Sequence, residues 1–160
     1  MTKRYDIAIA GGGPAGSAAA WHAVKTGARV VVLDKAEFPR DKPCGDGLTP
    51  RAVSYVQKMG LADEVAQFHR LNRATIFSPT EWELSFPRRP AMPDHGHGIR
   101  RSELDTMLLM NAASAGAEVR QSAAVVGPVV NDEGRVVGVT LDSGERVMAD
   151  AVIAADGAYS

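Results

Sequence analysis

A glycine-rich turn near the start of the chain, Gly11-Gly-Gly-Pro-Ala-Gly16, limits the possible folds more than any other feature of the sequence. It follows an apolar run, residues 7–10, that can be buried on both faces as a central parallel strand requires. An alanine-rich segment that favours a helix comes next, and Val30–Leu33 predicts a second buried strand. A strand, a glycine turn, a helix and a second strand in this order are typical of a dinucleotide-binding βαβ unit.

Three glycines of this turn have separate tasks in such a unit. Gly11 opens the tight turn, Gly13 lets a pyrophosphate approach the backbone, and Gly16 lets the helix pack closely on the strand. Pro14 falls in the first helical turn, where a missing N–H costs little, and the free N–H groups there suit a diphosphate.

An acid follows the second predicted strand. Asp34 lies at about the 20-residue spacing from the glycine turn expected of a carboxylate that binds ribose hydroxyls. It favours free hydroxyls over a 2′-phosphate, whereas the adjacent Lys35 would suit a phosphate, so both are cofactor-binding candidates. A glycine turn without any ligand is the alternative, and the strand, helix and acid in this order argue against it.

Composition excludes several classes of protein. The 160 residues suffice for one ordinary domain, and 45% hydrophobic with 23% charged residues is typical of globular proteins. A net charge of −1 lacks the excess of positive charge that is typical of nucleic-acid-binding proteins. The single cysteine, Cys44, excludes an internal disulfide and fits a reducing compartment. With no signal peptide and no membrane-spanning apolar run, the sequence predicts a cytoplasmic protein.

The rest of the chain predicts further helices and strands. Thr49-Pro50 is a good helix start, because a hydroxyl can cap the helix and proline suits its first position. Ser102 and Asp105 resemble a capping box at the start of another helix. We expect a loop at 36–47, helices at 50–59 and 61–68, two strands within 73–86 and turns at 87–98. Leu104, Leu108 and Ala112 would form the apolar face of the next helix, and 117–121 would be a third parallel strand.

Short β-rich runs separated by turn signals follow. Residues 123–130, 135–141 and 145–148 predict a three-stranded meander, and 151–154 predicts a further apolar strand. A helix normally crosses between parallel strands, so a meander in this position argues against a plain NAD-binding module.

At this point the chain resembles the large FAD-dependent oxidoreductases of the glutathione-reductase fold. The Gly11–Gly16 turn, the acid at 34, the meander and the Ala-Asp156-Gly-Ala-Tyr-Ser ending are similar to that class in order and spacing. Within it, the loop Phe38-Pro-Arg-Asp-Lys-Pro-Cys-Gly-Asp-Gly-Leu-Thr-Pro50, paired with Arg101-Ser-Glu-Leu-Asp105, resembles the geranylgeranyl reductase family. Its Cys-Gly-Asp-Gly version is similar to bacterial menaquinone reductases.

The resemblance implies an α/β fold: a Rossmann-like FAD-binding domain of the glutathione-reductase type, whose parallel sheet has a three-stranded β-meander crossover. Residues 1–160 would form the N-terminal part of that domain, with 87–98 as the turn-rich segment of an inserted region. Family members continue well beyond this length, so the C-terminal substrate part would be absent and the fragment inactive by itself.

The resemblance also implies roles for individual residues. The glycine turn would contact the FAD pyrophosphate, the 42–47 loop would lie along the flavin, and the start of the meander would offer its backbone to adenine. Cys44 is in addition a candidate proton donor, and no metal ligands are expected. The candidate cofactor-binding residues are Gly11, Gly13, Pro14, Ala15, Gly16, Asp34, Lys35, Lys42, Cys44, Gly45, Asp46, Gly47, Arg101, Val125, Asp156 and Gly157.

Some of these residues have plainer interpretations. Cys44 is alternatively an inert thiol, Lys42 a solvated loop charge and Asp156 a turn residue. Arg101 is alternatively solvated, although a cation at a helix N-terminus is unfavourable and an anionic partner would explain it. His95 and His97 lack a third ligand at a sensible spacing, which favours a loop over a metal site.

The function implied is reduction of carbon–carbon double bonds in an isoprenoid chain, such as a geranylgeranyl or menaquinone side chain, by an FAD-dependent oxidoreductase. NAD(P)H remains open as the reductant of the full-length enzyme. The partners would be an isoprenoid lipid and the C-terminal segment, with peripheral membrane contact and no nucleic acid. Two alternatives stay open: a flavin-dependent monooxygenase or halogenase of the same fold, and a catalytically inactive nucleotide-binding fragment.

Overall fold

The computed structural model describes residues 4–44, 46–73, 75–80, 83–85 and 89–157. The predicted site residue Gly45 and the end of the Asp-Gly motif, residues 158–160, lie outside these residues. The chain divides into two compact units, which are described separately. The larger unit comprises Met1–Lys42 with Ser102–Ser160, and the smaller unit comprises Pro43–Arg101.

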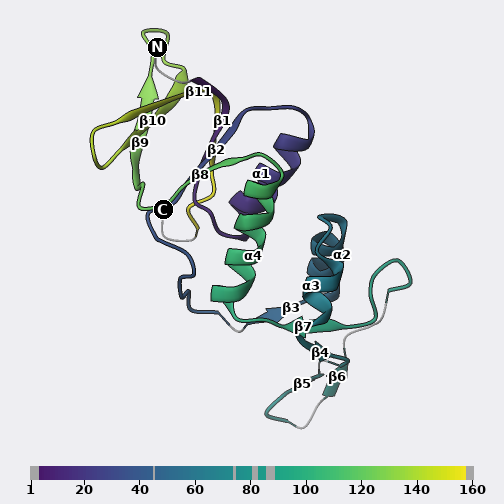
Figure 1. Ribbon diagram of the computed structural model, residues 1–160. Helices are drawn as coiled ribbons and strands as arrows, with labels where there is room; N and C mark the ends of the chain where they lie inside the picture. Colours follow the sequence, from purple (N-terminus) through teal and green to yellow (C-terminus); the bar gives the residue numbers. More distant parts are fainter. Residues whose placement is uncertain (1–3, 45, 74, 81–82, 86–88, 158–160) are drawn as a thin grey trace. The chain divides into compact units, whose positions relative to one another are not determined.

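A six-stranded sheet in the order β8-β2-β1-β11-β10-β9 organises the larger unit (Figure 1). Pairing is parallel from β8 through β11, whereas β10 is antiparallel to both β11 and β9. A parallel core with an attached β-meander confirms the predicted fold class. The strands are β1 (Arg4–Ala10), β2 (Val30–Leu33), β8 (Glu118–Arg120), β9 (Val125–Val130), β10 (Val136–Leu141) and β11 (Arg146–Ala154).

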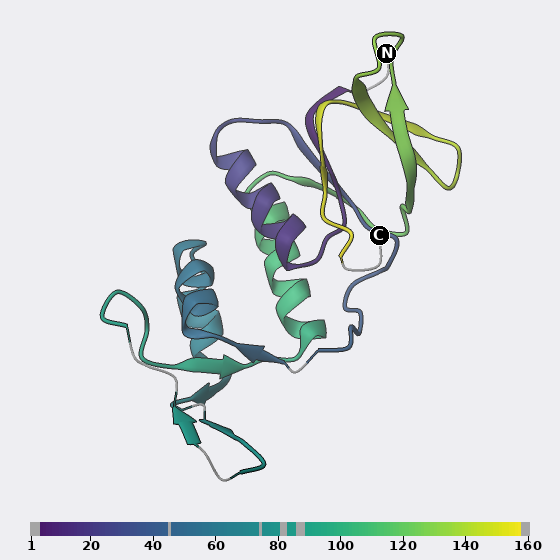
Figure 2. The same cartoon turned by 180° about the vertical axis from the view of Figure 1, so that it is seen from behind.

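Alternate residues of the central strands serve two separate cores, as the two-residue period of a strand requires. Ile9, Val30 and Val32 pack with side chains of α1 (Pro14–Lys25) and α4 (Arg101–Ser114), which lie on one face of the sheet (Figure 2). Side chains of opposite parity, such as Val31 and Leu33, pack with residues of the meander on the other face. Burial on both faces explains why these strands are continuous apolar runs.

The meander differs from the prediction in one respect. Residues 145–148 and 151–154 were expected to form separate strands, but Arg146–Ala154 is one continuous strand, β11. It pairs with β10 at its start and with β1 from Met148 to Ala154. The polar Asp150 does not interrupt it, because its exposed carboxylate accepts a hydrogen bond from Arg4 Nε of the neighbouring strand at 2.9 Å.

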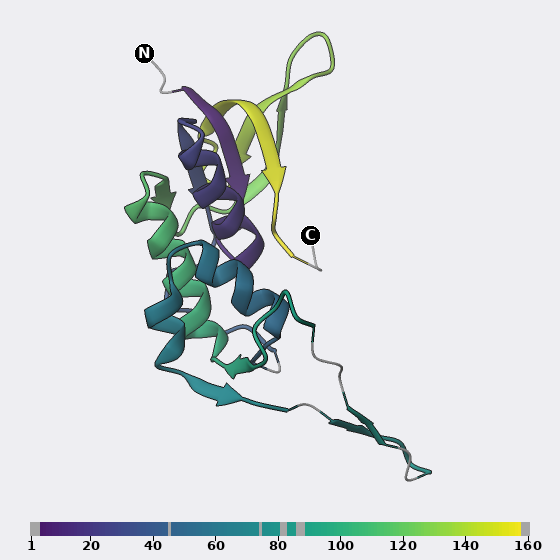
Figure 3. The same ribbon diagram turned by 90° about the vertical axis from the view of Figure 1, so that its right-hand side faces the viewer.

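In the smaller unit, α2 (Pro50–Lys58) begins where the sequence predicts. The Thr49 side chain accepts a hydrogen bond from Ala52 N–H at 3.3 Å, and Pro50 is the first helical residue. The short helix α3 (Ala62–Ala66) lies beside α2, and α2 contacts β7 (Figure 3). The strands of this unit are β3 (Gly47–Leu48), β4 (His69–Leu71), β5 (Thr75–Phe77), β6 (Glu83–Ser85) and β7 (Gly96–Gly98).

Three of these strands were not predicted. The sheet has the order β3-β7-β4, and its central strand Gly96–Gly98 falls within the segment 87–98, where only turns were expected. The sequence Gly-His-Gly has no strand signal of its own, so pairing with β3 and β4 on both sides determines its conformation. The two strands expected within 73–86 are present as the β5–β6 hairpin.

None of the helices in the described part of the chain has the length and apolar character that crossing a membrane requires.

Burial on β2 leads to a stability prediction. Val32→Ala removes two methyl groups from a fully buried side chain, which should lower the free energy of unfolding by about 2–3 kcal/mol. Val126→Ala makes the same change on β9, where the side chain is 64% exposed, and should cost less than about 1 kcal/mol. Urea unfolding followed by circular dichroism measures both losses. Equal losses would contradict the burial of β2.

Candidate cofactor site

The glycine turn joins β1 to α1 with very little space between backbone segments. A Cβ atom at Gly16 would lie 1.8 Å from Gly11 O, and one at Gly11 would lie 2.4 Å from Ala155 O. Gly11 also has a φ of +103°, which residues with side chains rarely adopt. The Ser17 hydroxyl, which is buried, donates to Gly12 O at 2.8 Å and ties the turn to the helix. The turn therefore requires glycine at both positions.

The start of α1 is suited to an anion. Gly13 is the N-cap residue and has no side chain to accept hydrogen bonds, and the first turn contains no acidic residue. Pro14 is half-buried at the first helical position and Ala15 is exposed. The N–H groups of this turn and the positive end of the helix dipole thus face a place where a diphosphate would be stabilised.

Asp34 is held at the end of β2. Its buried carboxylate accepts hydrogen bonds from Gly12 N–H at 2.6 Å and from Ala36 N–H at 2.9 Å, one on each oxygen. An ionised carboxylate has about four acceptor positions, so two remain for ribose hydroxyls. Lys35, the other candidate, is exposed.

Two further segments reach the same region of the larger unit. Ala123 N–H donates to Asp34 O at 2.8 Å, which brings the start of β9, including the half-buried Val125, next to Asp34. Ala155 N–H donates to Ala10 O at 2.8 Å, so the exposed Asp156 and Gly157 directly follow the strand position beside the glycine turn. The structure thus places the predicted adenosine and pyrophosphate residues around the carboxyl ends of β1 and β2.

A buried ion pair that the sequence pattern did not predict lies near this turn. Asp105 of α4 has no exposed surface, and its Oδ2 lies 3.2 Å from Nη1 of Arg40. Nη2 of Arg40 lies 3.4 Å from the position that a Cβ at Gly13 would occupy. One feature of the sequence could have indicated this pair. Asp105 directly follows Leu104, so the acid falls on the face of the helix that is otherwise apolar and buried.

This pair also corrects the predicted capping box. Ser102 lies inside α4, which begins at Arg101, and the Asp105 side chain is directed to Arg40. Asp46, distant in sequence, accepts a hydrogen bond from Arg101 N–H at 3.2 Å and so takes the capping role. A sequence pattern cannot distinguish a local cap from one supplied by another segment.

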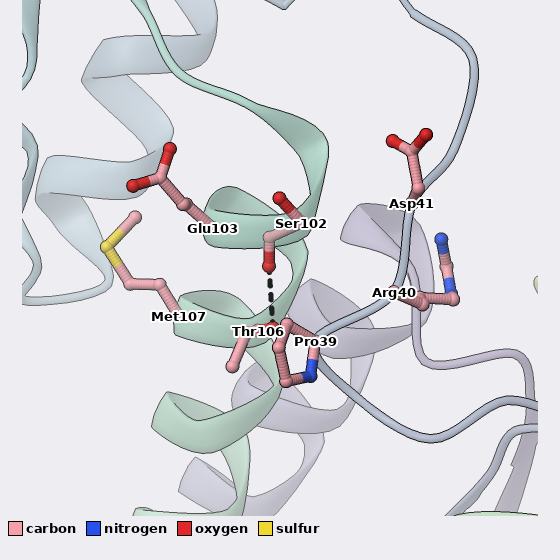
Figure 4. Close-up of a pocket in the computed structure, with 7 residues that line it drawn as sticks. All are labelled: Pro39, Arg40, Asp41, Ser102, Glu103, Thr106 and Met107. Atoms are coloured by element: carbon pink, nitrogen blue, oxygen red, sulfur yellow. Dashed lines mark hydrogen bonds between the residues drawn. The ribbon is translucent and has the colours of Figure 1, made fainter.

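An open cavity of about 550 Å³ lies between the 39–41 segment and the first turns of α4 (Figure 4). Thr106 Oγ1 donates to Ser102 O at 2.6 Å within its wall. Arg40 contributes to this wall as well as to the buried pair, so the residue lies between the cavity and the glycine turn. The lining residues are Pro39, Arg40, Asp41, Ser102, Glu103, Thr106 and Met107.

The smaller unit contains the predicted flavin-side residues Cys44, Asp46, Gly47 and Arg101. Asp46 adopts a φ of +53° and its carbonyl accepts from Ile99 N–H at 2.8 Å, while Gly47 pairs with Gly98 in the sheet. These contacts fix the loop against the residues that precede α4. Lys42 belongs to the larger unit, where it ends the segment Met1–Lys42, and its side chain is half-buried.

Cys44 has an exposed thiol with an altered acidity. A hydrogen bond from the backbone of Asp46, and secondly one from the Arg101 side chain, hold the pKa of the Cys44 thiol below its usual range. Both interactions favour the thiolate, the more nucleophilic form of cysteine.

Two histidines, one in β7 and one just before it, each lie close to a polar partner. His97 is buried and its Nδ1 lies 3.2 Å from Phe68 O, while His95 Nδ1 lies 2.8 Å from Asp94. Within the described ranges, no group of three or more His, Cys, Asp or Glu side chains is arranged to hold a metal ion.

The larger unit therefore has the fold and the turn of a dinucleotide-binding domain. The close-packed glycine turn, the uncapped start of α1 and the Arg40 Nη2 atom beside Gly13 all fit a bound pyrophosphate. The chain belongs to the FAD binding domain family, which it matches over residues 4–160. This membership identifies FAD as the cofactor, as the sequence predicts.

Relatives and solved structures extend this result. The chain is 42% identical over 163 residues to a menaquinone reductase of Mycolicibacterium smegmatis, covering 100% of this chain and 39% of that protein. It resembles the crystal structure of a geranylgeranyl bacteriochlorophyll reductase-like protein from Thermoplasma acidophilum, with a TM-score of 0.79, 30% identity and coverage of 98% and 40%. The flavin-dependent brominase Bmp2 gives a TM-score of 0.86 with 28% identity and coverage of 97% and 38%. The chain thus spans well under half the length of these proteins.

The close contact at Gly16 predicts a sensitive position. Gly16→Ala places a methyl group on Gly11 O, so the turn must shift and FAD affinity should fall at least roughly tenfold. Gly127→Ala is the control, because a Cβ there meets nothing within 4 Å. Titration of FAD fluorescence measures both affinities. Equal FAD affinity in the two variants would show that the turn does not hold the cofactor.

The acidity of Cys44 predicts a pH-dependent reactivity. Alkylation by iodoacetamide should reach half of its maximal rate below the ordinary thiol pKa of about 8.5, since the thiolate is stabilised. Arg101→Gln should move this midpoint upward, whereas Arg100→Gln, at the exposed neighbouring residue, should leave it unchanged. Mass spectrometry of the modified protein measures the rate. An unchanged midpoint in Arg101→Gln would contradict the contact between Arg101 and Cys44.

Proposed function

We propose that the protein is an FAD-dependent oxidoreductase that reduces carbon–carbon double bonds of an isoprenoid chain, with a menaquinone side chain as the leading substrate. The observation that carries this proposal is the 42% identity to a menaquinone reductase along the whole chain. The loop at 38–50, with its Cys-Gly-Asp-Gly sequence, agrees with it.

Fold similarity by itself does not select this reaction. The brominase Bmp2 has the higher TM-score, 0.86 against 0.79 for the reductase-like protein, yet one fold can support many chemistries. Sequence identity gives the opposite order, with 42% for the menaquinone reductase and 28% for the brominase. The loop residues between Phe38 and Pro50 would carry the difference, and a halogenase remains the second candidate.

Reduced FAD supplies a hydride to one alkene carbon when it is bound, and a proton must reach the other carbon. The chain's own residues would hold the cofactor at the glycine turn and Asp34, and would present Cys44 as a candidate proton donor. Arg101 and the Asp46 backbone favour the Cys44 thiolate, so this residue would need to regain its proton from solvent in each cycle. The sixteen cofactor-binding residues predicted from the sequence are proposed as contacts of FAD, and Cys44 has the additional role of proton donor.

The cellular setting follows from the proposed substrate. A menaquinone side chain resides in a lipid bilayer, so a cytoplasmic enzyme would visit the membrane surface peripherally. NAD(P)H is the proposed source of electrons for the flavin. The remainder of the protein would complete the substrate chamber.

The test is anaerobic incubation of the FAD-loaded full-length protein with excess dithionite and menaquinone. A product heavier by two hydrogen atoms, with the quinone ring unchanged on reoxidation, is expected by mass spectrometry. Menaquinone with a fully saturated side chain is the substrate control. Arg101→Gln should lower the rate at least roughly tenfold, while Arg100→Gln should retain it. A halogenated product with bromide and oxygen, and no saturated side chain, would establish the second candidate instead.

A further inference from the structure

We infer that Arg40 is a contact residue for the FAD pyrophosphate and that Asp105 is the positioning residue that directs its guanidinium there. This inference rests on the FAD site of the larger unit and is independent of the substrate proposed above. Neither residue belongs to the glycine turn or to the cofactor-binding set predicted from the sequence.

The two ends of the guanidinium face different parts of the larger unit. Nη1 lies 3.2 Å from Asp105 Oδ2, and Nη2 lies 3.4 Å from where a Cβ at Gly13 would be. Arg40 is largely buried, with 18% of its side chain exposed. The fixed planar shape of the guanidinium means that a contact at one nitrogen sets the direction of the other.

The electrostatic balance at this place favours a second anion. The Arg40 cation stands at the start of α1, where the helix dipole is positive and repels it. Asp105 supplies one negative charge to Nη1 in an ion pair at 3.2 Å, whereas Nη2 lies beside Gly13 of the glycine turn. A pyrophosphate would supply charge and acceptor oxygens together, and arginine suits both.

Two further contacts hold the segment that contains Arg40. Phe38 N–H donates to Gln121 Oε1 at 2.5 Å, and the Arg40 guanidinium lies 4.8 Å from the Phe38 ring in a cation–π contact. Asp105 then holds the far side of the guanidinium from a rigid helix. A preorganised cation loses little conformational entropy on binding, so its contribution to affinity is larger.

The inference predicts affinity losses that depend on phosphate. Arg40→Met should weaken binding of FAD and ADP roughly 10- to 100-fold, the range for hydrogen bonds to charged groups, and should leave adenosine within about twofold. Arg135→Met, at an exposed position of the meander turn, is the control. Calorimetry and displacement of FAD from the purified protein measure these affinities.

Asp105 is tested through the same ligands. Asp105→Asn should weaken ADP binding several-fold and Asp105→Glu should restore part of it, whereas Glu103→Gln on the exposed side of α4 should change nothing. Arg40→Lys keeps the buried charge and replaces Arg40→Met if that variant does not fold. The Arg40→Lys variant should bind ADP more tightly than Arg40→Met and less tightly than the unchanged protein.

The results separate the possible roles. Equal losses for ADP and adenosine in the Arg40 variants would mean that the pair only supports the fold, and unchanged ADP affinity would also overturn the inference. A phosphate-dependent loss of affinity, together with no isoprenoid reduction by the full-length protein, would support the inference and refute the proposed function.

Discussion

The fold of the larger unit depends on the direct contact between the first turn of α1 and the end of β1. At Gly16 and Gly11 the backbones approach so closely that a single carbon atom on either residue would overlap with a carbonyl oxygen. This approach lets the helix start immediately above the carboxyl ends of the parallel strands. It is also why the N–H groups of that turn, rather than side chains, would contact a bound diphosphate.

The second constraint is that several chain segments share this small space. Asp34 uses each oxygen of its carboxylate to hold a backbone N–H, one in the glycine turn and one after β2. Ala123, which precedes β9, donates its N–H to the carbonyl oxygen of Asp34. Asp34, the proposed ribose-binding acid, thus also joins these segments, and its replacement would disturb the glycine turn and the start of the meander together.

How much could be predicted from the sequence depended on the range of the interactions involved. The βαβ unit, the Thr49 cap and the apolar face of α4 follow from local patterns, and the structure agrees with them. The strand Gly96–Gly98 and the direction of Asp105 depend on partners far away in the chain, so no local pattern reports them. Of the candidate site, the glycine turn was readable from the sequence, whereas the buried cation beside it was not.

The continuity of β11 has a mechanical consequence. Its first residues belong to the meander that borders the adenosine side, and its last residue leads to the segment beside the glycine turn. The strand therefore sets the distance between the two segments that are proposed to contact the cofactor. Loss of one residue within it would either shift the far end by one position or turn Val147 and Ala149 out of the core. The length of this strand consequently sets the spacing between the meander and the glycine turn.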